Sequence, residues 1–307
     1  MDRGGFVDGV LAARFEAERG RLRAVAQRML GSTGEAEEAV QEAWLRLGRA
    51  GAEEVANLPG WLTTVVSRIC LDVLRARAVR REEPAGEGLP EVVDGGAGPE
   101  REALLVESVG RALLVVLERL GPAERVAFVL HDGFAVPFEQ IAPIVGRSPV
   151  AAKKLASRAR RRVRGAAVPG PERPAGHRRV VEAFLAASRG GDLGALLAVL
   201  APDVVRRADP AALPPGRALV ACGAEVVARE TLVFGRRARF GAVVLVDGVP
   251  GIVIAPGGRL RLVLRVAVVD GRVAGYEVVA DRARLAALEL TLLPEGGLQG
   301  RGADGQA

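Results

Sequence analysis

The sequence predicts a multidomain chain, in which two all-α helical bundles precede an α+β domain with a curved antiparallel sheet. A length of 307 residues favours two or three domains over one. Two stretches rich in proline and glycine, 84–100 and 167–176, separate three blocks. Apolar residues recur at helical spacing in the first two blocks, whereas the third contains runs of Val, Leu and Ile typical of strands.

The first block, 6–83, has the periodicity of amphipathic helices. Val40, Ala43, Trp44 and Leu47 fall on one helical face, and 62–73 repeats the pattern. Ser32 and the acidic residues after it favour a helix start there, because carboxylates stabilise the positive end of the helix dipole. The acidic, Pro- and Gly-rich stretch 84–100 that follows is predicted to be a flexible linker.

The second block, 101–166, is predicted to end in a helix-turn-helix. Pro137 opens a short helix, 146–147 forms a tight turn, and Ser148 caps a last helix. The buried face of that helix is expected to be Ala152, Leu155, Ala159 and Val163. Pro143 lies inside the short helix and is expected to bend or shorten it, because proline lacks the amide donor.

The third block, 177–293, is predicted to change from helix to sheet. Residues 177–200 are helical in period, and four strands are expected at 242–246, 251–255, 260–269 and 272–279. Asp-Gly pairs and a Pro-Gly-Gly segment between the strands indicate hairpin turns. A helix at 282–292 closes the domain, and the tail 294–307 is expected to be disordered.

Composition narrows the function classes. The formal charge of +6 permits a polyanionic partner. Two cysteines and two histidines, without CxxC spacing or a Cys/His cluster, predict neither a disulfide nor a metal site, and no cofactor is expected. Without a signal-peptide core or a long apolar run, the sequence predicts a cytoplasmic protein with no membrane association.

The strongest functional signal is the cationic helix after Ser148, which contains no acidic residue as far as Gly165. A solvated surface helix usually mixes charges of both signs, so nucleic-acid binding is favoured. Base edges in the major groove are expected to meet the N-terminal part of the helix, and phosphates the later arginines. The residues predicted to contact DNA are Ser148, Val150, Ala151, Lys153, Lys154, Ser157, Arg158, Arg161 and Arg162.

Two helices in the first block supply a second signal. An acidic amphipathic helix contains Glu38, Gln41 and Glu42, and the next helix begins at Trp61 and continues into a stripe of arginines. Aromatic and hydroxyl groups followed by cations suit a melted DNA strand, because flipped bases need an apolar pocket and phosphates need positive charge. Taken alone, the acidic helix is better explained as a surface helix, whereas Trp61 fits a core residue and a base-stacking residue about equally.

Together these segments resemble RNA polymerase sigma factors of the extracytoplasmic-function type. The acidic helix and the Trp61 helix are similar to the second conserved region of that family, and 120–125, 138–142 and 146–162 are similar to the fourth. The resemblance implies core RNA polymerase and promoter DNA as partners, with Glu38, Gln41 and Glu42 on the polymerase clamp. It also implies −10 contacts from Asn57, Trp61, Thr63, Thr64, Arg68 and Arg75.

The third block resembles the SnoaL-like, NTF2-type cone that one subgroup of these sigma factors carries. Segments 88–92 and 206–217 depart from the subgroup's usual motifs. The resemblance implies a regulatory domain that modulates sigma activity in cis, and we hypothesise that it biases the spacing of the two helical domains. The sequence names neither a small-molecule regulator nor an anti-sigma factor.

Two other functions compete with this interpretation. A helix-turn-helix regulator with a ligand-sensing C-terminal domain would explain the cationic helix, but it would leave the Gln41 and Trp61 helices without a role. An enzyme would need a buried acid or base in the third block. Asp247 and Asp270 fall in predicted turns and His177 at a helix start, so the sequence predicts no catalytic residues.

Overall fold

The computed structural model describes residues 3–50, 57–82, 101–164 and 174–293. The predicted linker 84–100, most of the hinge 167–176 and the tail 294–307 lie outside these ranges. The chain divides near Val163 into two compact units, the first of which also includes Phe240–Ala242 and Val253–Leu262. None of the described helices has the length and apolarity needed to cross a bilayer.

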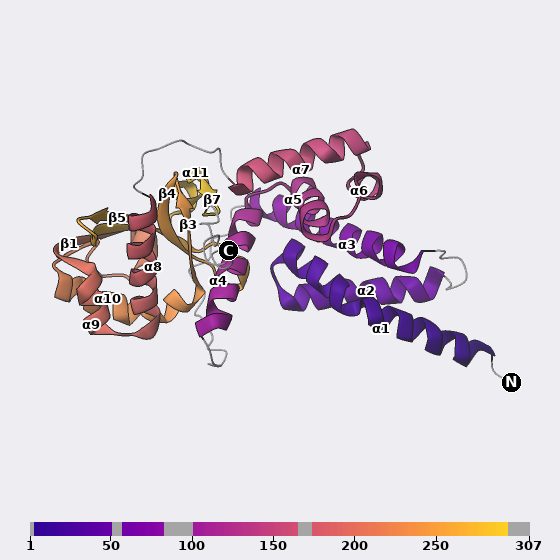
Figure 1. Cartoon of the computed structure of the whole chain (residues 1–307), viewed down its shortest axis with the longest axis horizontal. Helices are drawn as coiled ribbons and strands as arrows, with labels where there is room; N and C mark the ends of the chain where they lie inside the picture. Colours follow the sequence, from indigo (N-terminus) through magenta and orange to yellow (C-terminus); the bar gives the residue numbers. More distant parts are fainter. Residues whose placement is uncertain (1–2, 51–56, 83–100, 165–173, 294–307) are drawn as a thin grey trace, which may run out of the picture. The chain divides into compact units, whose positions relative to one another are not determined.

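Three long helices form the N-terminal bundle (Figure 1): α1 (Arg3–Leu30), α2 (Thr33–Ala50) and α3 (Leu58–Glu82). As predicted, α2 starts beside Ser32, whose Oγ accepts a hydrogen bond from the Glu35 amide at 3.4 Å. Leu22, Met29, Leu47 and Leu62 are fully buried between the helices. The apolar periodicity of the sequence therefore forms the core of this bundle.

The next five elements are helical: α4 (Arg101–Glu118), α5 (Pro122–Phe128), a π-helical turn η2 (Val129–Gly133), α6 (Phe138–Val145) and α7 (Pro149–Arg164). The π turn was not expected from the sequence. It places His131 so that its ring stacks on Phe138 at 3.9 Å between centroids, and its Nδ1 lies 3.1 Å from the Val136 carbonyl. These contacts join the π turn to the first residue of α6.

Helix α6 includes Pro143 and has only eight residues. It ends at Gly146, which adopts the left-handed conformation (φ 67°) that favours glycine and lets the chain turn into α7. The predicted inward face of α7 needs one correction. Leu155 is only half-buried and Ala156 is fully buried, because the alanines Ala152, Ala156 and Ala159 let the helix approach its neighbours closely.

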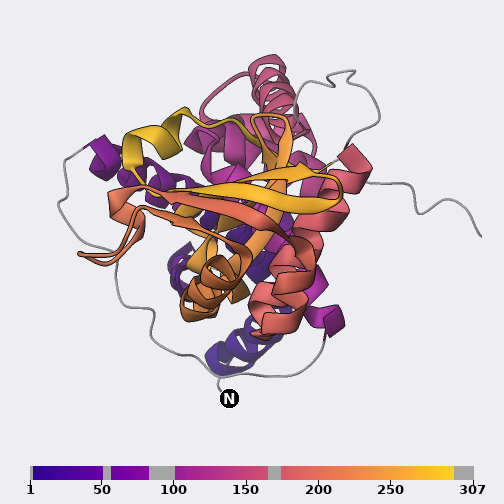
Figure 2. The same ribbon diagram turned by 90° about the vertical axis from the view of Figure 1, so that its left-hand side faces the viewer.

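The C-terminal part of the chain is the predicted α+β domain (Figures 1 and 2). Helix α8 packs on β6 and α10 on β1. The Asp-Gly pairs 247–248 and 270–271 both have positive φ, as two-residue hairpin turns require. The elements are α8 (Pro174–Gly190), α9 (Leu193–Val199), β1 (Leu200–Ala208), η3 (Pro210–Ala212), β2 (Val220–Cys222), α10 (Ala224–Phe234), η4 (Gly235–Phe240), β3 (Gly241–Val246), β4 (Val249–Ile254), η5 (Pro256–Gly258), β5 (Leu262–Val269), β6 (Arg272–Val279), α11 (Arg282–Ala287) and β7 (Leu290–Thr291).

The sheet has seven strands in the order β2-β1-β6-β5-β4-β3-β7 and is mixed. The prediction of a purely antiparallel sheet is wrong in one place, because β1 runs parallel to β6. The crossover through α10 and β3–β5 brings these distant strands together, which local periodicity cannot show. The predicted helix 282–292 is also too long: α11 ends at Ala287, and Leu290–Thr291 pairs with β3.

Candidate nucleic-acid interface

The start of α7 presents an open surface. Ser148 caps the helix, with its Oγ 3.3 Å from the Ala151 amide nitrogen, and Pro149 occupies the first helical position. Val150 is 67% exposed although it is apolar, and Ala151 is half-buried. Lys153, Lys154 and Ser157 are exposed one turn further along. A duplex groove would therefore meet a small hydroxyl, a valine and two ammonium groups at this end.

The arginines of α7 fall into two groups that the sequence alone did not separate. Arg160 lies 2.7 Å from Asp132 of the π turn, and Arg162 lies 2.8 Å from Glu124 of α5. These two pairs fix α7 on the helices beneath it. Within the described residues no ion pair is found for the other cations of the helix, which are Lys153, Lys154, Arg158, Arg161 and Arg164.

Arg147 is a cation that sequence reasoning left out of the site. It lies in the turn between α6 and α7, is exposed, and forms no ion pair among the described residues. Its amide bonds back to the Ala142 carbonyl at 3.0 Å, which fixes the turn. Its position beside the helix start, rather than on the helix, is why a search for a cationic helix face missed it.

The start of α3 gathers the residues predicted to contact the −10 element. Asn57 caps the helix, with its Oδ1 accepting from the Gly60 amide at 3.1 Å, and Trp61 is half-buried. The Thr64 hydroxyl is half-buried and donates to the Gly60 carbonyl at 3.0 Å. Trp61 thus stands, half-buried, in the first turn of a capped helix.

Thr63 behaves differently from its neighbours. It is 5% exposed, and its hydroxyl donates to the Pro59 carbonyl and accepts from Arg21 of α1, both at 2.6 Å. These bonds hold α1 against the start of α3. In this conformation the Thr63 side chain faces the bundle interior, because it lies on the opposite side of the helix from the solvent-exposed Asn57 and Arg68.

Arg68 and Arg75 lie further along α3 and are both exposed. Arg68 donates to the carbonyl of Pro143 at 3.3 Å, and Arg75 lies 3.6 Å from Asp72. The Asp72 contact is an exposed pair of the kind that contributes little to stability. Both guanidinium groups are therefore available to exchange their present partners for phosphates at small cost.

The exposed surface of α2 contains the residues predicted to meet the polymerase. Glu38 and Gln41 are exposed, whereas Glu42 is half-buried and its carboxylate lies 2.8 Å from Arg46. Leu45 is 48% exposed and follows Gln41 by one helical turn. Sequence reasoning missed Leu45, although an apolar residue outside the periodic face of α2 was a usable signal.

Two family models match the helical part of the chain. Sigma-70 region 2 matches residues 14–80, and Sigma-70 region 4 matches residues 110–163. The ECF RNA polymerase sigma factor SigJ of Mycobacterium tuberculosis (strain ATCC 25618 / H37Rv) is 44% identical over 225 residues, which span 72% of each chain. The protein belongs to the ECF RNA polymerase sigma factors.

Other relatives cover more of this sigma factor. The probable ECF RNA polymerase sigma factor SigI of M. tuberculosis (strain CDC 1551 / Oshkosh) is 36% identical over 291 residues, 92% of this chain and 97% of the relative. A crystal structure of the M. tuberculosis ECF sigma factor SigJ shares 37% identity, covers 89% of this chain and 98% of that one, and has a TM-score of 0.42.

Family membership decides between the sigma-factor and the regulator interpretations. The protein is a sigma factor that directs transcription initiation, with core RNA polymerase and promoter DNA as its partners. A free-standing helix-turn-helix regulator is disfavoured, because region 2 is present together with region 4. Sigma factors as a family are not enzymes.

Proposed function

We propose that α7 recognises the −35 element through its N-terminal turns. The observation that carries the proposal is the separation of its cations: Lys153, Lys154 and Arg158 are exposed with no ion pair in the described residues, whereas Arg160 and Arg162 are held by acids. Ser148, Val150, Ala151, Lys153, Lys154 and Ser157 would face base edges. Arg158 and Arg161 would bind phosphates. Arg162 is assigned instead to positioning α7.

The start of α3 is proposed to hold the opened −10 strand. Trp61 would stack on an unpaired base, with Asn57 and Thr64 at the same helix end and Arg68 and Arg75 on the phosphates. The incomplete burial of Trp61 and the exposure of Arg68 and Arg75 support this assignment. Thr63 contributes by fixing Arg21 and α1 rather than by direct contact, since its hydroxyl is already bonded twice.

Helix α2 is proposed to dock on the polymerase through Glu38, Gln41 and Glu42, together with Leu45. An apolar side chain beside charged groups is a common composition for the centre of an interface. Replacing Leu45 with aspartate is expected to weaken core polymerase binding by about tenfold or more, while the bundle stays folded because the residue is half exposed. The matched control is Leu47→Ala, which is fully buried and is expected to lower the melting temperature instead.

Transcription with purified components tests these assignments together. Holoenzyme containing Lys153→Ala is expected to lose about 1–3 kcal/mol of binding to a −35 duplex, because a base contact is removed. Arg158→Ala, which removes a phosphate contact, is expected to weaken binding to specific and non-specific duplexes alike. Trp61→Ala is expected to leave duplex binding intact and to slow opening of the −10 region, measured by permanganate reactivity of unpaired thymines. If every variant lost −35 duplex binding and −10 opening to the same extent, the assignment of α7 to the −35 element and of α3 to the −10 element would be wrong.

The C-terminal α+β domain is proposed to modulate initiation in cis, in the cytoplasm where the polymerase works. The support is a fused α+β domain of more than a hundred residues, which follows the two sigma regions in the same chain. Truncation after about residue 170 is expected to change promoter-dependent transcription markedly. Unchanged output from a truncated chain that melts cooperatively would remove this part of the proposal.

A further inference from the structure

The buried and the most exposed residues of α7 form two stripes on opposite faces of the helix. Four residues are buried at a spacing that keeps side chains on one face: Ala152, Ala156, Ala159 and Val163. A helix turns by about 100° per residue, so the residues two positions earlier lie about 200° away. We call these four exposed residues the outer stripe: Val150, Lys154, Ser157 and Arg161.

Two ion pairs fix which face of α7 points outward. Arg160 and Arg162 lie on opposite sides of the buried stripe, because one follows a member of that stripe and the other precedes one. Arg160 lies 2.7 Å from Asp132, and Arg162 lies 2.8 Å from Glu124. Rotation of α7 about its own axis would break one pair or the other. The outer stripe is therefore held as the part of α7 that a DNA groove meets first.

Val150 is the apolar member of the outer stripe, and its side chain stands in the open. The residue is 67% exposed. Valine has a lower helix propensity than lysine, arginine or glutamate, and its methyl groups gain nothing from exposure to water. Neither helix formation nor solvation accounts for a valine at this position, whereas contact with an apolar group of a partner does.

Promoter DNA, a partner of this sigma factor, supplies such a group. Among the base edges of the major groove, the C5-methyl of thymine is the apolar group, and the edges are otherwise read through hydrogen-bond donors and acceptors. A valine on the outer stripe matches that methyl, because contact between them removes both apolar surfaces from water. The chemistry of Val150 therefore selects thymine over the other three bases.

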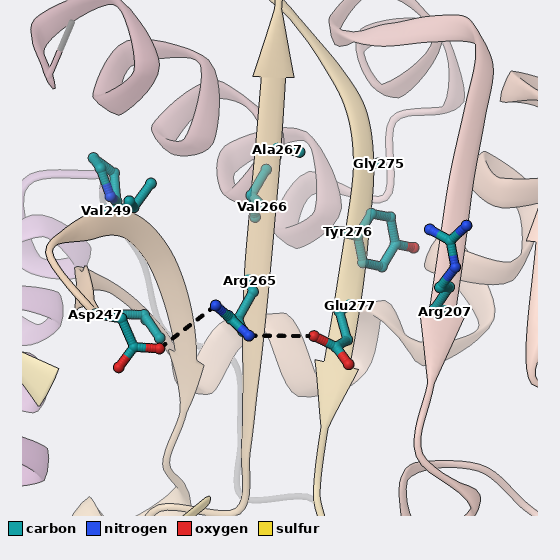
Figure 3. Close-up of a pocket in the computed structure, with 11 residues that line it drawn as sticks. Arg207, Asp247, Val249, Arg265, Val266, Ala267, Gly275, Tyr276 and Glu277 are labelled. Atoms are coloured by element: carbon teal, nitrogen blue, oxygen red, sulfur yellow. Dashed lines mark ion pairs between the residues drawn. The ribbon is translucent and has the colours of Figure 1, made fainter. Parts of the chain in front are cut away.

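Lys154 follows Val150 by one turn on the outer stripe and forms no ion pair among the described residues. Exposed charges elsewhere are engaged inside the chain: Figure 3 shows Arg265 of β5 between Asp247 and Glu277, at 3.6 and 3.7 Å. A lysine that keeps its donors open can bind O6 and N7 of guanine. Four residues of helix rise by about 6 Å, which spans one or two base pairs at about 3.4 Å each.

We propose that α7 reads a thymine through Val150 and, one or two base pairs away, a guanine through Lys154. The inference rests on the proposed −35 contact of α7 and names the bases that this contact selects. Burial of one methyl group against Val150 is expected to strengthen binding about fourfold. The contact of Lys154 with guanine is expected to contribute about tenfold.

A selection experiment with holoenzyme identifies the preferred bases. Core polymerase carrying the full-length chain selects duplexes from a pool with a randomised upstream window. The wild-type chain is expected to enrich a thymine and a guanine at the stated spacing. Val150→Ala is expected to lose the thymine preference alone, and Lys154→Ala the guanine preference alone. Val233→Ala on α10 changes a valine that is 62% exposed in the C-terminal domain, and it must leave both preferences unchanged.

Deoxyuridine then tests the methyl contact directly, because it differs from thymidine only in lacking the C5-methyl. In the selected duplex, this replacement is expected to weaken wild-type binding about fourfold and to leave the binding of Val150→Ala unchanged, as measured by fluorescence anisotropy. Val150→Ala is expected to melt at or above the wild-type temperature, because the site is exposed and alanine favours helix more than valine does.

Three results overturn the inference. Wild-type binding that tolerates deoxyuridine at every thymine excludes the methyl contact. A Val150→Ala variant that still distinguishes thymine from deoxyuridine excludes Val150 as the residue that reads it. A Val150→Ala variant that weakens binding to all duplexes alike, or to core polymerase, places Val150 on the DNA backbone or on the polymerase. In each case the −35 assignment of α7 stands if Lys153→Ala or Lys154→Ala changes the selected sequence, and it fails as well if neither does.

Discussion

Replacing Arg161 and Arg162 with alanine, one at a time, is expected to give opposite results although the two residues are adjacent on α7. Arg161 is exposed and forms no ion pair among the described residues. The guanidinium of Arg162 lies 2.8 Å from the carboxylate of Glu124, whose side chain is only 13% exposed. Arg161 is therefore free to bind a phosphate, whereas Arg162 is already engaged in holding α7 on α5.

The size of the effect follows from counterion release. Each phosphate contact contributes about 0.9 to the slope of log K against log salt concentration on duplex DNA. At about 0.1 M monovalent salt, the loss of one contact therefore corresponds to about an eightfold weaker complex, or about 1.2 kcal/mol. Arg162→Ala removes the ion pair with Glu124, in which the arginine side chain is largely exposed. The substitution is therefore expected to lower the free energy of unfolding by about 1 kcal/mol or less. It is expected to leave the slope of log K against log salt concentration unchanged, because no phosphate contact is lost.

The assay is fluorescence anisotropy of holoenzyme on a labelled −35 duplex over a series of salt concentrations, with thermal melting of each free variant. Arg161→Ala is expected to reduce the slope on specific and non-specific duplexes alike, because a phosphate contact carries no sequence information. The reasoning is refuted if Arg162→Ala reduces the slope as much as Arg161→Ala does, since its pairing with Glu124 would then be irrelevant in the complex.

Three further predictions concern stability and reactivity. Burial raises the pKa of the Cys70 thiol to about 12, so a thiol reagent at about pH 8 is expected to label exposed Cys222 quickly and Cys70 only on unfolding; fast labelling of both would contradict the buried placement. Burial alone would raise the pKa of Asp209, but hydrogen bonds from two backbone amides and Arg284 lower it below its ordinary value of 3.8. The ionised carboxylate therefore stabilises the fold above pH 3.8, and this stabilisation is lost as the pH falls through the lowered pKa. Asp209→Asn should lower the free energy of unfolding by about 1–3 kcal/mol at neutral pH and make it less dependent on pH in the acid range, as measured by denaturation at a series of pH values. A Cβ at Gly275 would lie 2.9 Å from the Val205 carbonyl oxygen, which is too close for the present spacing of β1 and β6. Gly275→Ala is therefore expected to lower the free energy of unfolding in urea by about 1–3 kcal/mol. An unchanged urea midpoint would show that β1 and β6 can move apart enough to accommodate the methyl group.

The helical part of the chain was predicted well because its signals are local. The Ser148 cap and the turn at Gly146 each depend on residues within one or two turns, and both stand in the structure as expected. The hairpins at Asp247 and Asp270 were predicted for the same reason, since an Asp-Gly pair encodes the positive φ of its own turn.

The misses share a different cause. No strand was predicted at β1, because the helical pattern was taken to end at residue 200 and nothing was assigned directly after it. The polar residues of β1 obscure the alternation of buried and exposed positions, which becomes visible only once the neighbouring strands are known. Its Arg206 is buried with an ion pair to Glu230 of α10, which is the third element after β1 along the chain. The short β7 was taken for helix because only pairing with β3 makes it a strand.

The sequence by itself determined the family, the two helical regions, the cationic character of α7 and the α+β class of the C-terminal domain, since periodicity, caps and turn residues act over a few positions. Tertiary structure decided which charges are available. It paired Arg160 and Arg162 with acids about 30 residues or more away, turned Thr63 inward, and aligned Arg207, Glu277 and Arg265 on one sheet face. Charge availability depends on distance in space, and only the packed chain fixes that distance.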